Sequence, residues 1–134
     1  MSGEKDLTAL LAGLNPRLNP GKFVFASVDN TLGISREKTV FEFKEQEGIT
    51  VVLSQEHADD YGLHYEFVAS WLTLEVHSSL EAVGLTASFA GALTDANISC
   101  NVVAGYYHDH IFVPHKDTTR AMEVLQKLKK SALD

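Results

Sequence analysis

Residues 98–114, ISCNVVAGYYHDHIFVP, predict a β-hairpin with aromatic and polar side chains at its tip. Apolar residues occupy every second position from 98 to 104, which is the period of a half-buried strand, and residues 111–113 form an apolar return strand. Gly105 lets the backbone turn between the two strands. When both strands pack, residues 106–109 are held at the rim of a sheet, where loops commonly present polar groups to a ligand.

The composition is that of a globular protein with one compact domain, or with two small domains that share a sheet. Of its 134 residues, 45% are hydrophobic and 22% are charged. No apolar run is long enough to cross a membrane, and the first residues lack the pattern of a signal peptide. The single cysteine, Cys100, forms no internal disulfide, as is usual in a reducing compartment. We therefore expect a cytoplasmic protein with no membrane partner.

The charge of the chain argues against a nucleic-acid partner. The formal net charge is −7, whereas phosphate contacts require a basic surface. The one cluster of lysines, at positions 127, 129 and 130, falls in the last turns of an expected helix. Positive charge interacts favourably there with the negative end of the helix dipole, so the cluster needs no nucleic acid to explain it.

The N-terminal half predicts one helix and three strands. Leucines with helical spacing end at Asn15-Pro16, and phenylalanines that alternate with polar or smaller residues mark two of the strands. The expected elements are a helix at 6–14, a loop at 16–21 caused by the Asn-Pro pairs, and strands at 22–28, 39–44 and 49–53. The turn Glu45–Gly48 joins the last two strands into a hairpin. The polar residues 54–64 fit either one helical turn or a loop.

The C-terminal half predicts the order strand, helix, strand, strand, helix. The expected ranges are 65–77, 85–97, 98–105, 110–114 and 117–131, and Asn97 is placed to end the first helix. These are five of the six elements of a ferredoxin-like unit. A right-handed crossover puts the 110–114 strand between the other two, so the 65–77 strand needs a neighbour from the N-terminal half. The expected fold is α+β, with two interlocked ferredoxin-like βαββα units on shared or facing antiparallel sheets that helices cover.

Two segments resemble a known family. Residues 79–85, SLEAVGL, lead into a helix that is followed by residues 97–103, NISCNVV, and this resembles the ACT domain. The nearest resemblance is to small two-half ACT-like proteins, which share the hairpin tip and the Glu45–Gly48 turn. It covers most of the chain and is strongest over 72–114. It divides the chain into an N-terminal ACT-like half at 1–64 and a C-terminal ACT domain at 65–134.

ACT domains are regulatory modules that bind amino acids or other small ligands, usually between two paired units. The resemblance therefore implies an amino-acid-type ligand and a homodimer. The resemblance covers no catalytic domain, so it does not say what the protein regulates.

Gly84 is the centre of the expected ligand site. It precedes the 85–97 helix, whose free N–H groups and positive dipole end attract a carboxylate that a glycine lets approach the backbone. Ser78 and the backbone of Val83 and Leu85 belong to the same site. The alternative is that Gly84 only makes a tight turn.

The hairpin supplies the other half of the expected site. Asn101 and Asp109 are expected to hold the ammonium group of the ligand, because a carboxylate pairs strongly with a cation. Val102 and His108, which adjoin them, complete the set. The alternative for Asp109 is a turn residue that bonds to its own backbone.

The histidines and Cys100 have simpler interpretations than catalysis. His108 and His110 lie two apart on one face and would form a metal site with His77 or His115, but no second cysteine or carboxylate spacing supports it. We expect hydrogen-bonded neutral imidazoles, and neither a metal nor another cofactor. Cys100 is expected to be a small buried hydrophobe rather than a nucleophile.

The sequence thus favours a regulatory module that binds a small molecule and is not an enzyme, and the resemblance implies that the small molecule is an amino acid. It contains no glycine-rich phosphate loop, nucleophile elbow or paired-carboxylate motif. Two alternatives remain open at this point. The first is a structural or partner-binding dimerisation module without a ligand, and the second is a small hydrolase or metal-dependent enzyme.

Overall fold

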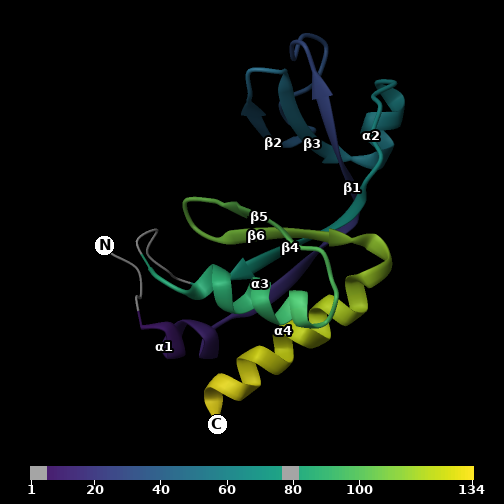
Figure 1. Ribbon diagram of the computed structural model, residues 1–134. Helices are drawn as coiled ribbons and strands as arrows, with labels where there is room; N and C mark the ends of the chain where they lie inside the picture. Colours follow the sequence, from purple (N-terminus) through teal and green to yellow (C-terminus); the bar gives the residue numbers. More distant parts are fainter. Residues whose placement is uncertain (1–5, 77–81) are drawn as a thin grey trace. The chain divides into compact units, whose positions relative to one another are not determined.

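The computed structural model describes residues 6–76 and 82–134, which form an α+β fold (Figure 1). The described strands make one six-stranded sheet in the order β2-β3-β1-β4-β6-β5. The chain divides into two compact units. Unit 1 contains the chain up to Asn19 together with Trp71–Asp134, and unit 2 contains Pro20–Ser70. The two halves expected from the sequence, 1–64 and 65–134, are contiguous, whereas unit 1 also takes in the N-terminal segment.

Two strands pass from one unit into the other. These are β1 (Asn15–Val28) and β4 (Val68–Glu75), which lie next to each other in the sheet. The neighbour that the 65–77 strand was expected to need is therefore β1, and β6 lies between β4 and β5 as the crossover rule predicts. The expectation of interlocked halves on a shared sheet is confirmed.

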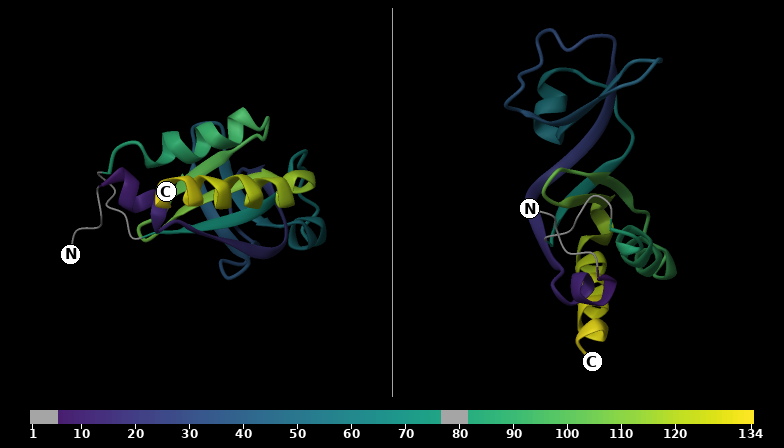
Figure 2. Two further views of the ribbon diagram at one scale, coloured as in Figure 1. Left: turned by 90° about the horizontal axis from the view of Figure 1, so that it is seen from below. Right: turned by 90° about the vertical axis from the view of Figure 1, so that its left-hand side faces the viewer.

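Unit 1 packs its helices on one face of its strands, as the two views of Figure 2 show. Its further elements are α1 (Leu7–Ala12), α3 (Leu85–Asp95), β5 (Asn101–Ala104), β6 (Asp109–Pro114), a 3₁₀ turn at His115–Asp117 and α4 (Thr118–Leu133). Asn97 has a left-handed backbone with φ of 59° just after α3, which confirms its predicted role in ending the helix.

The core of unit 1 lies between this helical layer and the sheet. Alternate residues of β4 and β6 point into it, including Leu72, Leu74, Ile111 and Val113, all fully buried. Phe89 of α3 meets them from the helical side and is also fully buried. Each such side chain contributes about 1.5–3 kcal/mol by leaving water, so this layer fixes which face of β4 and β6 is left for polar groups.

Unit 2 is a three-stranded sheet with one short helix. Its own elements are β2 (Thr39–Lys44), β3 (Ile49–Ser54) and α2 (Gln55–Asp60). The β2–β3 hairpin is closed by Glu45 N–H, which donates to the Gly48 carbonyl at 3.0 Å, as the predicted turn requires. The undecided stretch 54–64 contains α2, because the hydroxyl of Ser54 accepts the His57 N–H at 3.1 Å and caps the helix.

The predicted loop at 16–21 is wrong, because β1 already begins at Asn15. The Asn-Pro pairs indicate a turn when considered alone, and Pro20 has no backbone N–H to donate to a neighbouring strand. The side chain of the preceding residue, Asn19, bonds to β4 instead. The side-chain amide of Asn19 donates to the Trp71 carbonyl at 3.2 Å and to the Thr73 hydroxyl at 2.9 Å. These bonds hold β1 against β4 beside the proline.

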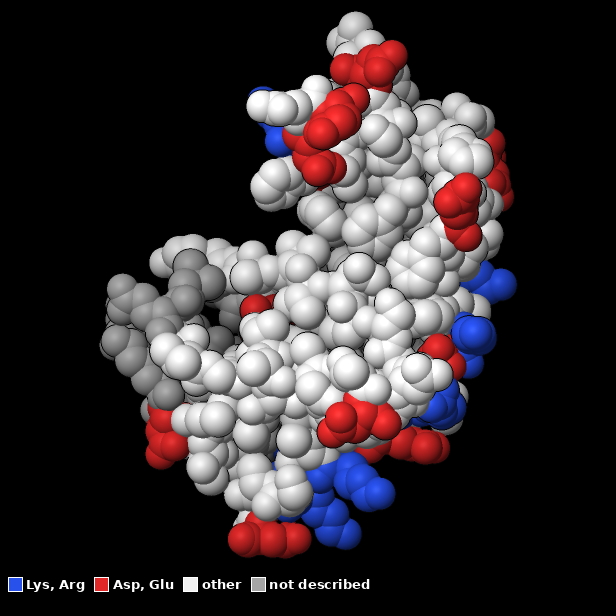
Figure 3. Space-filling view, viewed as in Figure 1, with Lys and Arg blue, Asp and Glu red and all other residues white. Residues whose placement is uncertain are grey.

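The surface charges fit the expected dipole role of the lysines. Figure 3 shows basic side chains gathered around α4 on a surface where acidic side chains also occur. In the described part of the chain, no helix is both long and apolar enough to cross a membrane.

Candidate functional site

The start of α3 leaves backbone N–H groups without a side-chain cap. Gly84 is the N-cap residue, with a left-handed backbone at φ of 95°, and it has no side chain to bond the first turn. A Cβ atom built on Gly84 would lie 3.3 Å from Cδ2 of Leu7 in α1. Both the backbone angle and this contact therefore favour glycine at position 84.

The residues around Gly84 divide between core and surface. Leu85 is buried in the core, so only its backbone faces the start of α3, whereas the Val83 side chain is 84% exposed. Ser78, the remaining residue predicted for this part of the site, lies outside the described residues.

The hairpin tip is tightly built around Gly105. Its N–H donates to the His108 carbonyl at 2.9 Å, and a Cβ atom at position 105 would lie 3.0 Å from that same oxygen. Tyr106 and Tyr107 are both exposed and contact each other edge to face, with ring centroids 5.0 Å apart. Figure 1 shows the tip at the same end of unit 1 as the start of α3.

The structure does not bring Asn101 and Asp109 together. Asp109 pairs with Ala104 and Asn101 pairs with Phe112, so the two side chains point to opposite faces of the hairpin. Asp109 shares the helical face with Val102, whose side chain packs against the core, and Asn101 is exposed on the other face. A ligand held by Asp109 on the helical face is therefore out of reach of Asn101.

Asp109 and His108 form an electrostatically unusual pair. Burial raises the pKa of the Asp109 carboxyl, and the neighbouring His108 acts in the opposite direction. Within the described residues, no hydrogen bond or ion pair reaches the Asp109 carboxylate, and Nδ1 of His108 is buried without a hydrogen-bond partner. Half-buried polar groups that lack partners are more common at functional sites than elsewhere.

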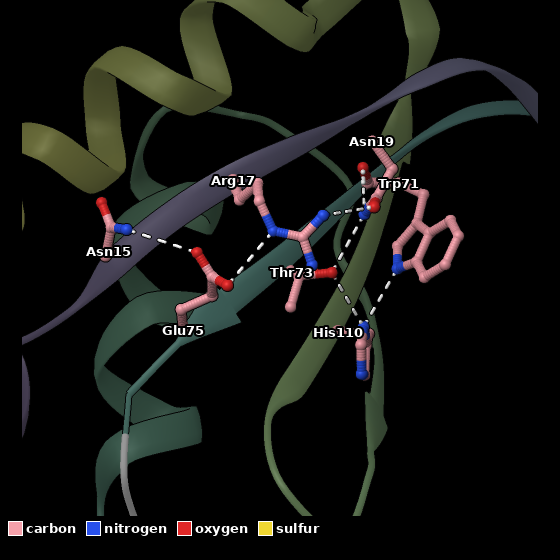
Figure 4. A network of polar contacts seen from close by, with 7 residues as sticks. All are labelled: Asn15, Arg17, Asn19, Trp71, Thr73, Glu75 and His110. Atoms are coloured by element: carbon pink, nitrogen blue, oxygen red, sulfur yellow. Dashed lines mark hydrogen bonds and ion pairs between the residues drawn. The ribbon is translucent and has the colours of Figure 1, made fainter.

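A row of polar side chains crosses the face of unit 1 opposite the helices (Figure 4). Glu75 of β4 accepts from Asn15 at 3.3 Å and pairs with Arg17 Nε at 3.2 Å. Arg17 also donates to the Asn19 side-chain oxygen at 3.0 Å. The Asn19 amide donates to Thr73, a residue with no exposed surface, and so extends the row from the rim into the buried part of the sheet.

The row ends at His110 of β6. Its Nδ1 accepts from the Trp71 indole N–H at 3.0 Å and lies 3.2 Å from the Thr73 hydroxyl. The Trp71 ring is stacked on Phe112, with centroids 6.2 Å apart and planes at 17°. Burial first, and then the charges of His108 and Arg17, lower the pKa of His110. This agrees with the hydrogen-bonded neutral imidazole expected for His110, whereas the same expectation fails for Nδ1 of His108, which has no hydrogen-bond partner in the described residues.

The alternation of polar residues in the segment 15–19 was a sequence signal for the β1 part of this row. Asn15, Arg17 and Asn19 occupy every second position, as polar residues do on one face of a strand, but the flanking prolines favoured a loop. The sequence therefore did not predict the part of this row that lies on β1.

Cys100 is half-buried and lies just before β5. Burial raises the pKa of its thiol to about 11, which fits an unreactive side chain. Among the described residues, which exclude His77, no group of three His, Cys, Asp or Glu side chains is placed to hold a metal ion.

Comparisons with known proteins agree on the family. One family profile described as ACT domain matches residues 2–70, and a second with the same description matches residues 66–127. A search of curated proteins finds no match. Among solved structures, a Vibrio cholerae protein of unknown function, described as a possible transport protein, is 43% identical with a TM-score of 0.83. The alignment covers 93% of this chain and 97% of that one.

More distant structures share the fold. The ligand-free regulatory subunit of aspartate kinase from Thermus thermophilus has a TM-score of 0.59 at 5% identity, over 87% of this chain and 98% of that one. Aspartate kinase from Clostridium acetobutylicum has a TM-score of 0.60 at 11% identity, over 89% of this chain and 34% of that one. The chain therefore belongs to the ACT domain family, with two ACT domains in tandem, and is in general terms a regulatory module that binds small molecules.

Proposed function

We propose that this protein binds a free amino acid or a closely similar zwitterion, and that it acts as a regulatory module without catalysing a reaction. The ligand carboxylate would bind to the N–H groups at the start of α3, and the ligand ammonium would bind to Asp109. Asn101 is left out of this site because it faces the other side of the hairpin.

Asp109 is the observation that carries this proposal. Among residues 6–76 and 82–134 no hydrogen-bond donor reaches this half-buried carboxylate, and burial raises its pKa more than the neighbouring His108 lowers it, so the ionised group is unfavourable in the free protein. A bound ammonium group would supply the missing positive charge and form a charge-assisted hydrogen bond. Such a residue destabilises the free protein and gains its partner only on binding, which is a common property of functional sites.

The start of α3 supports the other end of the ligand. The helix has 11 residues, enough for a developed dipole, and its first-turn N–H groups meet no side chain from Gly84. A free amino acid has few atoms, so we expect a dissociation constant between about 1 mM and 1 μM, or roughly −4 to −8 kcal/mol.

A thermal-shift screen of the twenty amino acids tests the proposal. A true ligand at about 100 times its dissociation constant stabilises the fold by roughly 2.7 kcal/mol, which raises Tm by about 10 °C for a chain of this size. Asp109→Asn keeps the shape of the side chain but removes its charge. It should abolish most of the rise without lowering the Tm of the free protein.

Two further substitutions test the start of α3. Ala87→Glu places a carboxylate in the first turn of the helix, where it occupies the same N–H groups. It should stabilise the free protein by about 0.3–1 kcal/mol and weaken ligand binding, whereas Ala87→Gln should do neither to the same extent. Asn101→Ala is the control on the opposite face and should bind as the wild type does.

The screen also contains the results that contradict the proposal. If no amino acid shifts the wild type, the amino-acid assignment is wrong. If one shifts Asp109→Asn as much as the wild type, the ligand binds elsewhere.

A second candidate function, a partner-binding or dimerisation module, is favoured by the exposed apolar residues at the same end of unit 1. Val83, Tyr106 and Tyr107 are 84%, 79% and 74% exposed. In addition, β5 is the last strand of the sheet and has a free edge in the described fold. Sedimentation of the free protein distinguishes the two, because this function predicts a dimer that Tyr106→Ser with Tyr107→Ser dissociates and that no amino acid affects.

A further inference from the structure

We propose that His110 is a pH-sensitive lock in unit 1, which as a neutral ring fastens β6 to β4 through Trp71 and Thr73 and which opens when the ring is protonated (Figure 4). This role requires no ligand, so it holds or fails independently of the proposed amino-acid site.

The hydrogen bond from Trp71 determines which nitrogen of the His110 ring carries the proton. An indole N–H only donates, so the Nδ1 atom that it reaches at 3.0 Å must be an acceptor without a proton. The Thr73 hydroxyl, 3.2 Å from the same atom, already accepts from the Asn19 amide and has its own proton left to donate. The neutral ring therefore carries its proton on Nε2.

Protonation is incompatible with this arrangement. A second proton on Nδ1 would point at the Trp71 N–H, and neither group has a lone pair to offer the other. The Thr73 oxygen is able to accept a hydrogen bond from the new Nδ1–H, but the bond from the Trp71 N–H to Nδ1 is then lost. The indole must leave its position or give up this hydrogen bond in a half-buried place, and its stacking on Phe112 depends on that position.

The surrounding charges oppose protonation on balance. Arg17 of β1 and His108 of the hairpin tip add positive charge near the ring, and burial disfavours the charged form most of all. Glu75 of β4 also faces this row, but it is already paired with Arg17 and Asn15. Asp109 adjoins His110 in sequence and points to the opposite face of the hairpin.

The sign of the pH effect follows from these interactions. The folded protein holds the pKa of His110 below its usual value of 6.5, so the folded state takes up the proton less readily than the unfolded state. The stability from the lock is complete above about pH 6.5 and is lost as the pH falls towards the folded pKa. Over that interval the folding equilibrium constant falls by up to about tenfold per pH unit.

Trp71 makes the lock directly observable, because it is the only tryptophan in the chain. Its emission and its indole N–H signal in NMR both report on the bond to His110. We expect both to change in one transition below about pH 6.5 when the protein is titrated from about pH 8 to about pH 5 without any amino acid present. The ¹⁵N signals of His110 at the upper end of the titration should show a neutral ring with its proton on Nε2.

Two variants isolate the residue responsible. His110→Asn places an amide oxygen near the position of Nδ1, so it accepts from Trp71 but does not titrate, and the transition should disappear. His108→Asn removes the neighbouring histidine and should keep the transition. Denaturant unfolding should show the wild type losing stability relative to His110→Asn as the pH falls, by up to about tenfold in the equilibrium constant per unit.

Three results would overturn the proposal. One is a Trp71 transition that persists in His110→Asn, and another is a wild-type protein whose Trp71 signals do not change before global unfolding. The third is an ¹⁵N spectrum with the proton of the neutral ring on Nδ1, a measurement on the wild type that decides the question even if His110→Asn does not fold.

Discussion

Gly84→Ala should destabilise the protein, and the structure gives the size of the effect. The residue has φ of 95°, where an L-residue with a Cβ atom is strained by about 1–2 kcal/mol. The new Cβ would also lie 3.3 Å from Cδ2 of Leu7, a contact that the flexible end of a leucine relieves by a small shift. We therefore expect a loss of about 1–2 kcal/mol, most of it from the backbone.

The same substitution within α3 provides a matched control. Gly91 lies inside the helix, and a Cβ atom built there meets nothing within 4 Å. Gly91→Ala should therefore stabilise the protein by about 0.4–1 kcal/mol, the opposite sign from Gly84→Ala.

Thermal and denaturant unfolding measure both variants. For 134 residues, each kcal/mol changes Tm by about 3–4 °C, so Gly84→Ala should melt about 3–8 °C below the wild type. The double variant Leu7→Ala with Gly84→Ala should lose less stability than the sum of the two single losses, because the contact between the new Cβ and Cδ2 of Leu7 is absent from it. A Gly84→Ala protein as stable as the wild type would refute the left-handed backbone at this turn.

Three further outcomes follow from buried or crowded groups. Because its pKa is raised, Asp109 costs the free protein stability as the pH rises above the ordinary value of 3.8, so Asp109→Asn should gain stability relative to the wild type between acidic and neutral pH in urea titrations. The Cys100 thiol, with a pKa of about 11 against an ordinary value of 9.0, should react about 100-fold more slowly with a thiol reagent near pH 8 than it does after unfolding; equal rates would contradict its burial. Gly48→Ala should cost about 1–3 kcal/mol in denaturant unfolding, because the Cβ would lie 2.7 Å from Oγ of Ser27 and 3.2 Å from the Val28 carbonyl oxygen. Adding Ser27→Ala should recover only the part of this loss that comes from the contact with Ser27.

The sequence predicted the elements whose signals are local. The spacing of Leu7, Leu10, Leu11 and Leu14 identified the first helix, and Asn97 identified the end of α3. The segment before Gly21 was misjudged, because its prolines lower the local preference for a strand while its bonds to β4 come from residues more than fifty positions away. Hydrogen bonds between residues so far apart in the sequence cannot be predicted from the local composition.

The candidate site was harder to predict than the fold. Asn101 and Asp109 are both odd-numbered, but a turn separates them, and only the register across that turn decides whether their side chains share a face. Here each odd position of β5 pairs with an even position of β6, which puts the two residues on opposite faces. The position of Gly84 at the start of α3 was easier to predict, because a glycine directly before a helical pattern commonly makes the turn into the helix, and its role in ligand binding stays a prediction.

The passage of β1 and β4 through both units limits how the chain can be divided. A gene fragment that begins at residue 65 would encode all of β4, α3 and α4, but would lack α1 and the segment Asn15–Asn19 that belong to the same compact unit. The product would present the unprotected edge of β4 to other chains, and another copy of the missing strand would be the best partner for it. Fragments of this protein should therefore aggregate or exchange strands, and protein prepared for isotope labelling or crystallisation should keep both halves on one polypeptide.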